Sequence, residues 1–475
     1  MIELSCKTKI LLKGKVFRLT SILVDLHEKI QAQSRVMTFI QRFNLANSLK
    51  SSGFTKEKGV KLIKLIGFVI SLIFTQKNLY EYLRSAGEDA PFKRDTVYRL
   101  LNNPNSNWRY LVLKLGATII SFLKHLTSDK RVCALIVDDS AYYRDRSKKV
   151  ELLARVKDHT TNRYFKGFRK LTVGWTDGAT FIPLIFALLS SSEAKNRLYE
   201  QGPEVPTGSP GQLRRQESIQ KATDVLLDSL SEILTCVKDF QYVLFDSWFS
   251  WPKVIKGVKA YHRDVICMLK DMPTLFYTYQ GKNYTLSKLY AQLDNKHFDK
   301  SSYIASIVVN YYGISARVVF VRNRNSTNKR EWLALLSTDI TITEEEIIRI
   351  YGLRWDIEVY FKVCKSFLGL AKEYQGRSYD SMVAHTAIVT IRYMILSIET
   401  RENQDNRAHG GMFYEFCDEI KSLEFREAFL LIVSLFMSTL RENLFLTKEM
   451  INKILTNFIN KLPGFMKRRL GLASA

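Results

Sequence analysis

The sequence predicts an α/β fold with a β-rich insertion, flanked by helical regions at both ends. Two apolar runs that end in aspartate, ALIVD at 134–138 and YVLFD at 242–246, are typical of buried strands. Residues 274–337 are rich in Tyr, Val and Ile with turn signals between them, which indicates a β-rich insertion. Apolar residues at helical spacing before residue 131 and after residue 341 predict the two helical regions.

The net charge of the chain indicates which kind of molecule it binds. The 475 residues include 71 Lys and Arg against 47 Asp and Glu, a net charge of +24, and 46% are hydrophobic. A disordered chain and a small disulfide scaffold are excluded by these values. The positive surplus predicts binding to a polyanion, most often nucleic acid. The longest apolar runs fall short of the ~20 residues that a membrane-spanning helix needs, so no membrane partner is expected.

Six scattered cysteines without a CxxC pair argue against a zinc ribbon or a redox motif. They are typical of a protein in a reducing cytoplasm. In the first 130 residues, Lys93, Arg94 and Arg99 lie beside a helix that ends in the turn NNPNSNW. This segment fits either a helix-turn-helix-like DNA contact or a small helical bundle with solvated lysines, and the sequence leaves both open.

From residue 131 onward the pattern becomes α/β. The stretches 162–178 and 179–191 alternate around Asp177-Gly178 and predict a hairpin that follows the first strand. A Pro/Gly-rich linker at 202–211 precedes a predicted helix at about 212–237. DVICMLK, at 264–270, is a further predicted strand.

Two carboxylates, Asp138 and Asp246, end these predicted strands. Sites in α/β sheets assemble at the carboxyl ends of strands, and a buried carboxylate there needs a cation or a partner. A lone aspartate at such a place more often starts a turn. Two of them in a protein of charge +24 favour a metal site.

A third carboxylate is on a single helix predicted at about 343–369, which begins at the capping pattern Thr343 to Glu346. At 100° per residue, the polar side chains on one face fall within an arc of about 60° beside the apolar stripe. These four are Tyr351, Arg354, Glu358 and Lys365. This row of side chains fits a site in which Glu358 binds a cation while Arg354 and Lys365 hold phosphate oxygens. It fits equally a set of salt bridges on a solvated helix face.

Two strand-end aspartates and one helical glutamate are the ligands that two-metal phosphoryl transfer requires. Hard oxygen ligands predict Mg²⁺, with Mn²⁺ as a substitute.

The order strand Asp, strand Asp, β-rich insertion and helical Glu resembles that of the DDE transposases, which have a ribonuclease-H-like fold. The spacing of Tyr351, Arg354, Glu358 and Lys365 is similar to the Tyr-Arg-Glu-Lys signature of the insertion-sequence-four family of bacterial transposases. Ser140, two residues after Asp138, resembles that family's Asp-x-Ser/Thr, which selects Asp138 rather than Asp139 as the first ligand.

The resemblance implies that Asp138, Asp246 and Glu358 are the catalytic residues and hold two Mg²⁺ ions. It implies that Tyr351, Arg354 and Lys365 bind DNA phosphates. It further implies a cytoplasmic, nucleoid-associated bacterial enzyme that binds the terminal inverted repeats of its own element as a homodimer, cuts double-stranded DNA and joins the free 3′-hydroxyl to target DNA.

The resemblance also implies a role for each of five predicted regions. They are a helical DNA-binding region at 1–130, the first part of the ribonuclease-H-like core at 131–273, the β-rich insertion at 274–337, the second part of the core with the Glu helix at 338–400, and a C-terminal helical region at 401–475.

Other residues fit the same function less specifically. Trp355 and, more weakly, Trp248 are candidates for stacking on an unpaired base, or core-edge aromatics. The loop after Asp138 contains four cations. They are expected to bind the DNA backbone if the loop lies near the site, and to be solvated surface charges if it does not. These cations are Arg144, Arg146, Lys148 and Lys149.

Three alternatives remain from the residues. A metal-dependent nuclease without strand transfer has the same site, and the sequence barely separates it from a transposase. A non-catalytic DNA-binding remnant is disfavoured by the three intact carboxylates. A two-carboxylate glycosidase does not explain the positive charge, because a neutral sugar gains little from it.

Overall fold

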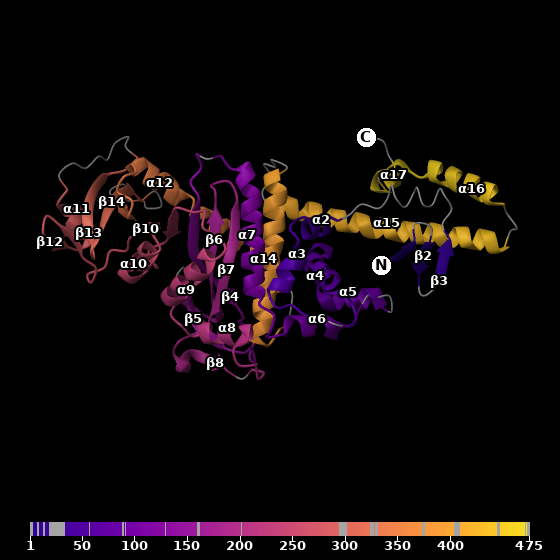
Figure 1. Ribbon diagram of the computed structural model, residues 1–475, viewed down its shortest axis with the longest axis horizontal. Coiled ribbons are helices and arrows are strands. Elements are labelled where there is room, and N and C mark those ends of the chain that lie inside the picture. The colour runs from indigo at the N-terminus through magenta and orange to yellow at the C-terminus, as the bar shows by residue number, and fades with distance from the viewer. Residues whose placement is uncertain are drawn as a thin grey trace. The chain divides into compact units, whose positions relative to one another are not determined.

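The computed structural model divides into two compact units (Figure 1). The larger unit comprises Phe43–Leu65 and Asp95–His409, and the smaller unit comprises Met1–Arg42, Ile66–Arg94 and Gly410–Ala475. The residues that the structure describes are 3–6, 9–12, 15–18, 34–56, 58–87, 90, 92–128, 130–158, 162–200, 202–293, 302–323, 327, 331–372, 376–402, 409–443, 447–470 and 472.

A mixed sheet is the centre of the larger unit. Within the described ranges it has twelve strands, in the order β12-β11-β13-β14-β15-β10-β9-β4-β6-β5-β8, with β7 paired to β6. The strands are β4 (Ala134–Tyr143), β5 (Leu153–Asp158), β6 (Arg163–Thr176), β7 (Phe181–Leu189), β8 (Arg197–Tyr199), β9 (Tyr242–Phe245), β10 (Asp264–Met268), β11 (Tyr277–Tyr279), β12 (Lys282–Tyr284), β13 (Ala305–Tyr311), β14 (Ile314–Arg322) and β15 (Trp332–Ser337).

The predicted strands form where apolar runs allow burial on both faces. β4 and β9 are parallel neighbours whose first four residues are all buried, as the sequence runs ALIV and YVLF require. β6 and β7 form the predicted antiparallel hairpin, and Gly178 in its turn has φ +81°. The strands of 274–337 continue the same sheet, because β15 pairs with β10.

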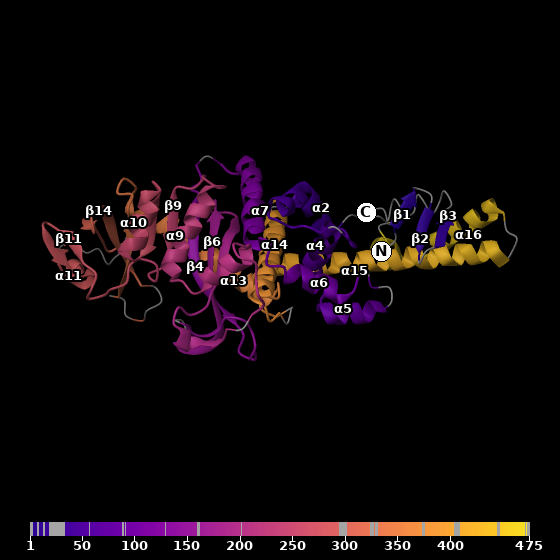
Figure 2. The same cartoon turned by 60° about the horizontal axis from the view of Figure 1, so that its bottom comes forward.

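Helices cover the sheet, and α7 and α14 lie side by side against β7 in both ribbon views (Figures 1 and 2). A Cβ at Gly116 of α7 would come within 2.6 Å of Leu184 of β7, so this close approach requires glycine. The helices are α3 (Leu45–Ser51), α6 (Arg94–Leu101), α7 (Trp108–Leu123), α8 (Pro210–Ser218), α9 (Ala222–Leu234), α10 (Pro252–Ala260), α11 (Leu286–Ala291), α12 (Glu344–Gly352), α13 (Trp355–Ser366) and α14 (Tyr379–Glu402), with short 3₁₀ turns at Lys124–Leu126 and Ala194–Asn196.

The single helix predicted at 212–237 is wrong in detail. The chain forms α8 and α9 there, and they are separated because Lys221 is extended, with φ −71° and ψ 137°.

The 24-residue helix α14 is the core helix of the larger unit. By length and composition it could cross a membrane, as could the bent pair Leu62–Thr75 and Leu79–Ala86 taken as one span. Every residue of the apolar window of α14 is buried inside the protein. The burial is what a core helix requires, and it explains why the helix is mainly apolar although it also holds buried polar side chains such as His385 and Arg392.

The smaller unit consists mainly of helices around an apolar cluster. Phe429, Leu430 and Val433 of α15 pack with Ile451 and Leu455 of α16. The elements are an antiparallel three-stranded sheet of β1 (Glu3–Cys6), β2 (Lys9–Leu12) and β3 (Lys15–Arg18), α2 (Arg35–Arg42), the 3₁₀ turn η1 (Leu72–Thr75), α5 (Leu79–Ala86), α15 (His409–Asn443), α16 (Lys448–Lys461) and α17 (Gly464–Leu470); the boundary between the units falls within α4 (Leu62–Ser71) and at the first residues of α6 and α15.

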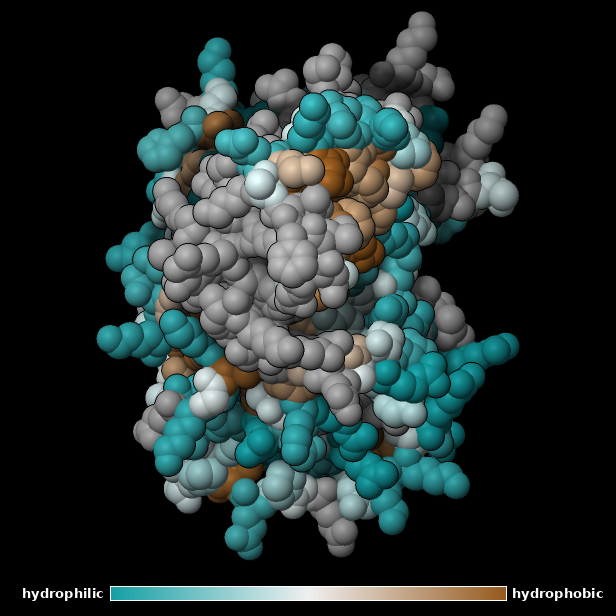
Figure 3. Space-filling view, turned by 90° about the vertical axis from the view of Figure 1, so that its right-hand side faces the viewer, coloured by the Kyte–Doolittle hydropathy of each residue, from teal (hydrophilic) through white to brown (hydrophobic). Residues whose placement is uncertain are grey.

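The surface of the smaller unit is mixed. Ile432 and Phe436 of α15 and Phe465 of α17 are exposed apolar side chains. Figure 3 shows hydrophobic groups among hydrophilic ones on the face that looks to the right in Figure 1.

Candidate active site

Asp138 and Asp246 lie next to each other where the pairing of two parallel strands ends; Asp246 directly follows β9, whereas Asp138 is the fifth residue of β4, which continues to Tyr143 beyond the predicted strand end. β4 and β9 pair in register from Ala134 opposite Tyr242 to Val137 opposite Phe245, and each aspartate is the next residue. Since adjacent strands are about 4.8 Å apart, this register places the two carboxylates side by side. The sheet thus brings together the two residues that the sequence predicted for one site.

The surroundings of Asp138 favour its neutral form. Burial, followed by the negative charge of Asp246, raises the pKa of Asp138 to about 7. The guanidinium of Arg354 lowers this pKa and the carboxylate of Glu358 raises it, both to a smaller extent. Burial also raises the pKa of Asp246, although the backbone N–H of Trp248 donates to its Oδ1 at 3.0 Å and opposes that shift. Negative charge is therefore concentrated here at a cost that a cation would relieve.

The prediction of one continuous helix at 343–369 is wrong. The chain forms α12 and α13, joined by a tight turn in which Leu353 N–H donates to Ile350 and Arg354 N–H donates to Tyr351, each at 3.0 Å. Bonds of this i to i−3 type turn the chain by about 120° per residue instead of 100°. The predicted row of side chains is consequently broken between Tyr351 and Arg354.

The residues of α13 keep their common face. Arg354, Glu358 and Lys365 line the same cleft as Asp138 and Asp246, whereas Tyr351 does not line it. The cleft has a volume of about 660 Å³, and its lining residues are Asp138, Asp139, Ser140, Ala141, Tyr143, Lys157, Asp158, Phe165, Arg169, Asp246, Trp248, Phe249, Arg354, Glu358, Phe361 and Lys365.

Arg354 links two of the three carboxylates. Its Nη1 donates to Asp138 Oδ2 at 3.1 Å, and its Nη2 donates to Glu358 Oε1 at 2.5 Å. The guanidinium carbon lies 5.9 Å from the centre of the Tyr351 ring, whose pKa is raised by burial. Tyr351 therefore packs against Arg354 behind the cleft instead of facing into it.

Lys365 lies at the other end of the same face. Its ammonium is 5.9 Å from the centre of the Tyr143 ring, and burial lowers its pKa. A cation with little solvent around it at the edge of an acidic cleft is suited to hold an anionic group of a substrate.

The four cations of the loop after β4 do not line this cleft. Arg144 turns inward, with Nη1 donating to the carbonyl of Ala371 and Nη2 to the Tyr142 hydroxyl, each at 3.4 Å. Arg146, Lys148 and Lys149 are exposed, and Lys149 lines a separate pocket with Tyr98 and Arg377.

The two tryptophans are placed differently. Trp355, the first residue of α13, is 62% exposed. Trp248 lines the cleft, and the guanidinium carbon of Arg169 lies 4.7 Å from the centre of its ring.

Arg169 is a cleft residue that the sequence analysis missed. It is on β6 opposite Ala141 of β4, and its Nη2 forms an ion pair with Asp139. Burial lowers the pKa of Arg169 to about 10, while the charges of Asp246 and Asp138 oppose that shift. Arg169 is one of four cations in β6, so the sequence does not single it out, and only the register of β4 with β6 places it beside Asp139.

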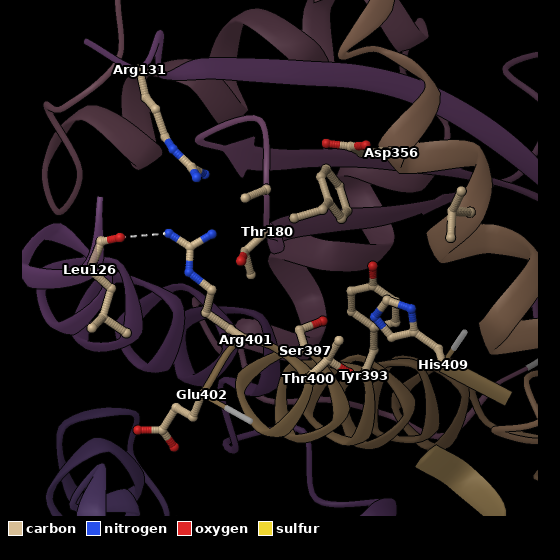
Figure 4. Close-up of a pocket in the computed structure, with 13 residues that line it drawn as sticks. Leu126, Arg131, Thr180, Asp356, Tyr393, Ser397, Thr400, Arg401, Glu402 and His409 are labelled. Atoms are coloured by element: carbon tan, nitrogen blue, oxygen red, sulfur yellow. Dashed lines mark hydrogen bonds between the residues drawn. The ribbon is translucent and has the colours of Figure 1, made fainter. Parts of the chain in front are cut away.

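A second pocket lies against another face of α13 (Figure 4). Asp356 and Val359 of α13 line it, and it contains none of the three predicted carboxylates. Arg401 points into it and donates to the carbonyl of Leu126 at 2.9 Å and to the buried carboxylate of Asp177 at 3.0 Å. Because Asp177 also accepts from the backbone N–H groups of Ala179 and Thr180, this arrangement holds the hairpin turn.

The cleft suits hard divalent cations by the chemistry of its donors. Asp138, Asp246 and Glu358 supply carboxylate oxygens, which Mg²⁺ and Mn²⁺ prefer. Among the described residues no three acidic, His or Cys side chains converge closely enough to hold one ion as they stand. Arg354 lies between Asp138 and Glu358, so its guanidinium occupies the place where a cation would neutralise them.

Two models of known protein families match parts of the chain. Residues 58–280 match the family model described as DDE superfamily endonuclease, and residues 215–395 match the model described as transposase DDE domain. None of the curated proteins matches the chain.

Two solved structures are similar to the chain at 11% identity. One is a piggyBac transposase synaptic complex with hairpin DNA, with a TM-score of 0.41 over 93% of this chain and 86% of that one. The other is a Drosophila P element transposase strand transfer complex, with a TM-score of 0.20 over 92% of this chain and 97% of that one. Both TM-scores are below 0.5, so the functional assignment rests on the family models and on the cleft.

Proposed function

Because the chain carries a transposase DDE domain, an enzymatic domain of DNA phosphoryl transfer, we propose that it cuts DNA at the ends of its own mobile element and joins those ends to target DNA. The observation that carries the proposal is the meeting of three carboxylates in one cleft. Two come from neighbouring parallel strands, and the third comes from α13. The predicted α/β fold class is confirmed, and the finer assignment to the insertion-sequence-four family is part of the proposal.

In this proposal Asp138, Asp246 and Glu358 hold two Mg²⁺ ions, with Mn²⁺ as a substitute. Bound ions of this kind lower the cost of charge on the attacking and leaving oxygens of a phosphodiester. The protein side chains orient the strand. The raised pKa of Asp138 supports this role, because a carboxylate that is costly to ionise alone gains most from a nearby divalent cation.

Arg354 and Lys365 bind the phosphates that flank the scissile bond. Arg354 has a planar set of donors, which two carboxylates occupy in the DNA-free structure and which a phosphate can accept from in the same geometry. Tyr351 supports this by packing against Arg354. Trp355 and Trp248 stack on unpaired bases, and Trp355 is suited to this by its exposure.

Of the four predicted loop cations, the exposed Arg146, Lys148 and Lys149 contact DNA backbone away from the cleft, whereas Arg144 donates to Ala371 and Tyr142 instead. The enzyme recognises terminal inverted repeats, acts as a homodimer that bridges both ends, and works in the bacterial cytoplasm. The five predicted regions, from 1–130 to 401–475, remain our proposed organisation of the chain, but the prediction that 1–130 is entirely helical is wrong because β1, β2 and β3 form a sheet there.

A joining assay tests the proposal. Purified protein with Mg²⁺ and a short duplex that carries the element's end should release a 3′-hydroxyl and then join it to a plasmid. Cleavage with a joined product supports a transposase. Cleavage without any joined product, under conditions in which both ends are supplied, supports the nuclease alternative instead, because a nuclease has the same metal site but no strand-transfer step.

A further inference from the structure

Lys170 is a fully buried lysine between the sheet and α13, outside the cleft. Its Nζ donates to the hydroxyl of Tyr360 at 2.6 Å. The ammonium also lies 4.4 Å from the centre of the Tyr360 ring and 5.6 Å from that of Phe361. The side chain thus ends among aromatic groups of α13, where cation–π attraction replaces part of its lost hydration.

The position of Lys170 in the fold is specific. On β6 it pairs with Ser140, which is two residues beyond Asp138 on β4. Its partner Tyr360 is two residues beyond Glu358 on α13. One hydrogen bond between side chains therefore connects the sheet beside the first carboxylate to the helix turn that carries the third.

This connection is costly for a purely structural purpose. Burial lowers the pKa of Lys170 to about 8, because the charged ammonium is poorly solvated there. An apolar side chain of similar length would fill the same space without that cost. The amine differs from such a side chain in one respect, which is that its hydrogen bond fixes the direction and distance of the contact.

We propose that Lys170 is a positioning residue whose hydrogen bond to Tyr360 sets the place of Glu358 relative to Asp138 and Asp246, and so the affinity of the three carboxylates for divalent cations. The effect passes through α13, since Tyr360, which accepts from Lys170, is two residues from Glu358 on that helix. The metal part rests on the proposed function, whereas the positioning of α13 does not.

Two variants test the contact from its two ends. Lys170→Met removes the amine and keeps the length of the side chain, and Tyr360→Phe removes the acceptor and keeps the ring. Thr390→Val is the matched control. Thr390 of α14 lies 3.1 Å from the same Tyr360 hydroxyl and donates to the carbonyl of Thr386 on its own helix, so its replacement leaves the Lys170–Tyr360 hydrogen bond in place.

The first measurement is hydrogen–deuterium exchange of the DNA-free protein. Both variants should exchange faster than the wild type in residues 355–366, and the control should not, because only the former lose the link from α13 to the sheet. Unchanged exchange in this segment would overturn the inference. Faster exchange across the whole larger unit would also overturn it, since that result means general destabilisation.

The second measurement is metal dependence. The Mn²⁺ affinity of the protein–DNA complex, followed by electron paramagnetic resonance, and the Mg²⁺ concentration for half-maximal cleavage should weaken about 10- to 100-fold in Lys170→Met, as for other residues that orient metal ligands. DNA affinity should not change. A Lys170→Met variant with the metal dependence of the wild type would overturn the inferred effect on metal affinity. A wild-type protein that does not cleave DNA at all would overturn the proposed function, but it would not change the conclusion from hydrogen–deuterium exchange.

Discussion

Arg354 donates to Asp138 across 3.1 Å, from the N-cap of α13 to the middle of β4, 216 residues away in sequence. The same guanidinium also donates to Glu358 one turn further along α13. Two carboxylates of the predicted metal site are thus held by a cation of the protein itself. A bound metal ion or a DNA phosphate must therefore compete with these two hydrogen bonds of Arg354.

Replacement of a single carboxylate should abolish cleavage and leave DNA binding intact. Asp138→Asn, Asp246→Asn and Glu358→Gln should each slow cleavage about 100-fold or more, because a lost metal ligand removes several kcal/mol of charge stabilisation. Asp356→Asn is the matched control, since Asp356 is on α13 but lines the other pocket. A Glu358→Gln protein that cleaves at the wild-type rate would exclude Glu358 as a ligand.

Arg354 should not tolerate lysine. Arg354→Lys keeps the charge but loses the planar pair of donors, so cleavage should fall about tenfold or more while the protein stays folded. Arg349→Lys is the control, because Arg349 of α12 makes a similar two-atom contact with Glu346 at the surface. Equal losses in both variants would mean that the geometry at Asp138 has no special part in the reaction.

Asp138 should make the metal-free protein less stable as the pH rises. The pKa of Asp138 is about 7 in the folded state, whereas the ordinary value for an aspartate is 3.8. At a pH between these two values the folded state therefore binds more protons than the unfolded state. The free energy of unfolding must then fall as the pH rises from 4 to 7. In EDTA, Asp138→Asn should gain stability relative to the wild type over this window, by an amount on the order of 1.4 kcal/mol per unit of pKa shift. Denaturant melts at several pH values measure this, and a constant difference would contradict it.

The exposed cations after β4 should contribute to DNA affinity without a part in chemistry. Arg146→Ala, Lys148→Ala and Lys149→Ala together should weaken binding and reduce the salt slope of the association constant by up to about 3, because each phosphate contact contributes about 0.9. A charge-matched control is the triple alanine variant of the exposed Lys256, Lys282 and Lys288. Equal effects of both triple variants would show that only the total charge matters.

Trp355 should act on an unpaired base. Trp355→Ala should hardly change the thermal midpoint, because the side chain is 62% exposed. It should impair steps that need an extruded base and spare first-strand nicking, with a loss of about 1–3 kcal/mol in the affected step. Separate assays of nicking and of second-strand processing measure this, and equal loss of both steps would exclude the stacking role.

Several features followed from local sequence. Apolar runs that end in Asp138 and Asp246 made buried strands, since only a sheet covered on both faces accommodates such runs. The turn at Asp177-Gly178 produced the predicted hairpin, because glycine permits a positive φ. Thr343 caps α12 by accepting from the N–H of Glu346, as its spacing predicted.

Other features could not be predicted from the sequence. The helix wheel assumed 100° per residue, and the tight turn at 350–354 moved Tyr351 behind Arg354. The position of Arg144 in its loop does not indicate its partner, the carbonyl of Ala371, which is distant in sequence. Arg169 and Lys170 reach opposite sides of the same strand, one toward Asp139 and the other toward Tyr360.

The sequence by itself therefore determined the two apolar strands, the carboxylates that follow their apolar runs, the helical glutamate and the positive charge, because these depend on local pattern and composition. Tertiary structure decided which cations meet which carboxylates. Strand register and helix packing set those pairings over more than a hundred residues of chain, as for Arg354 with Asp138 and Lys170 with Tyr360. A pairing of this kind depends on the distance between elements in space, and residue order does not encode that distance directly.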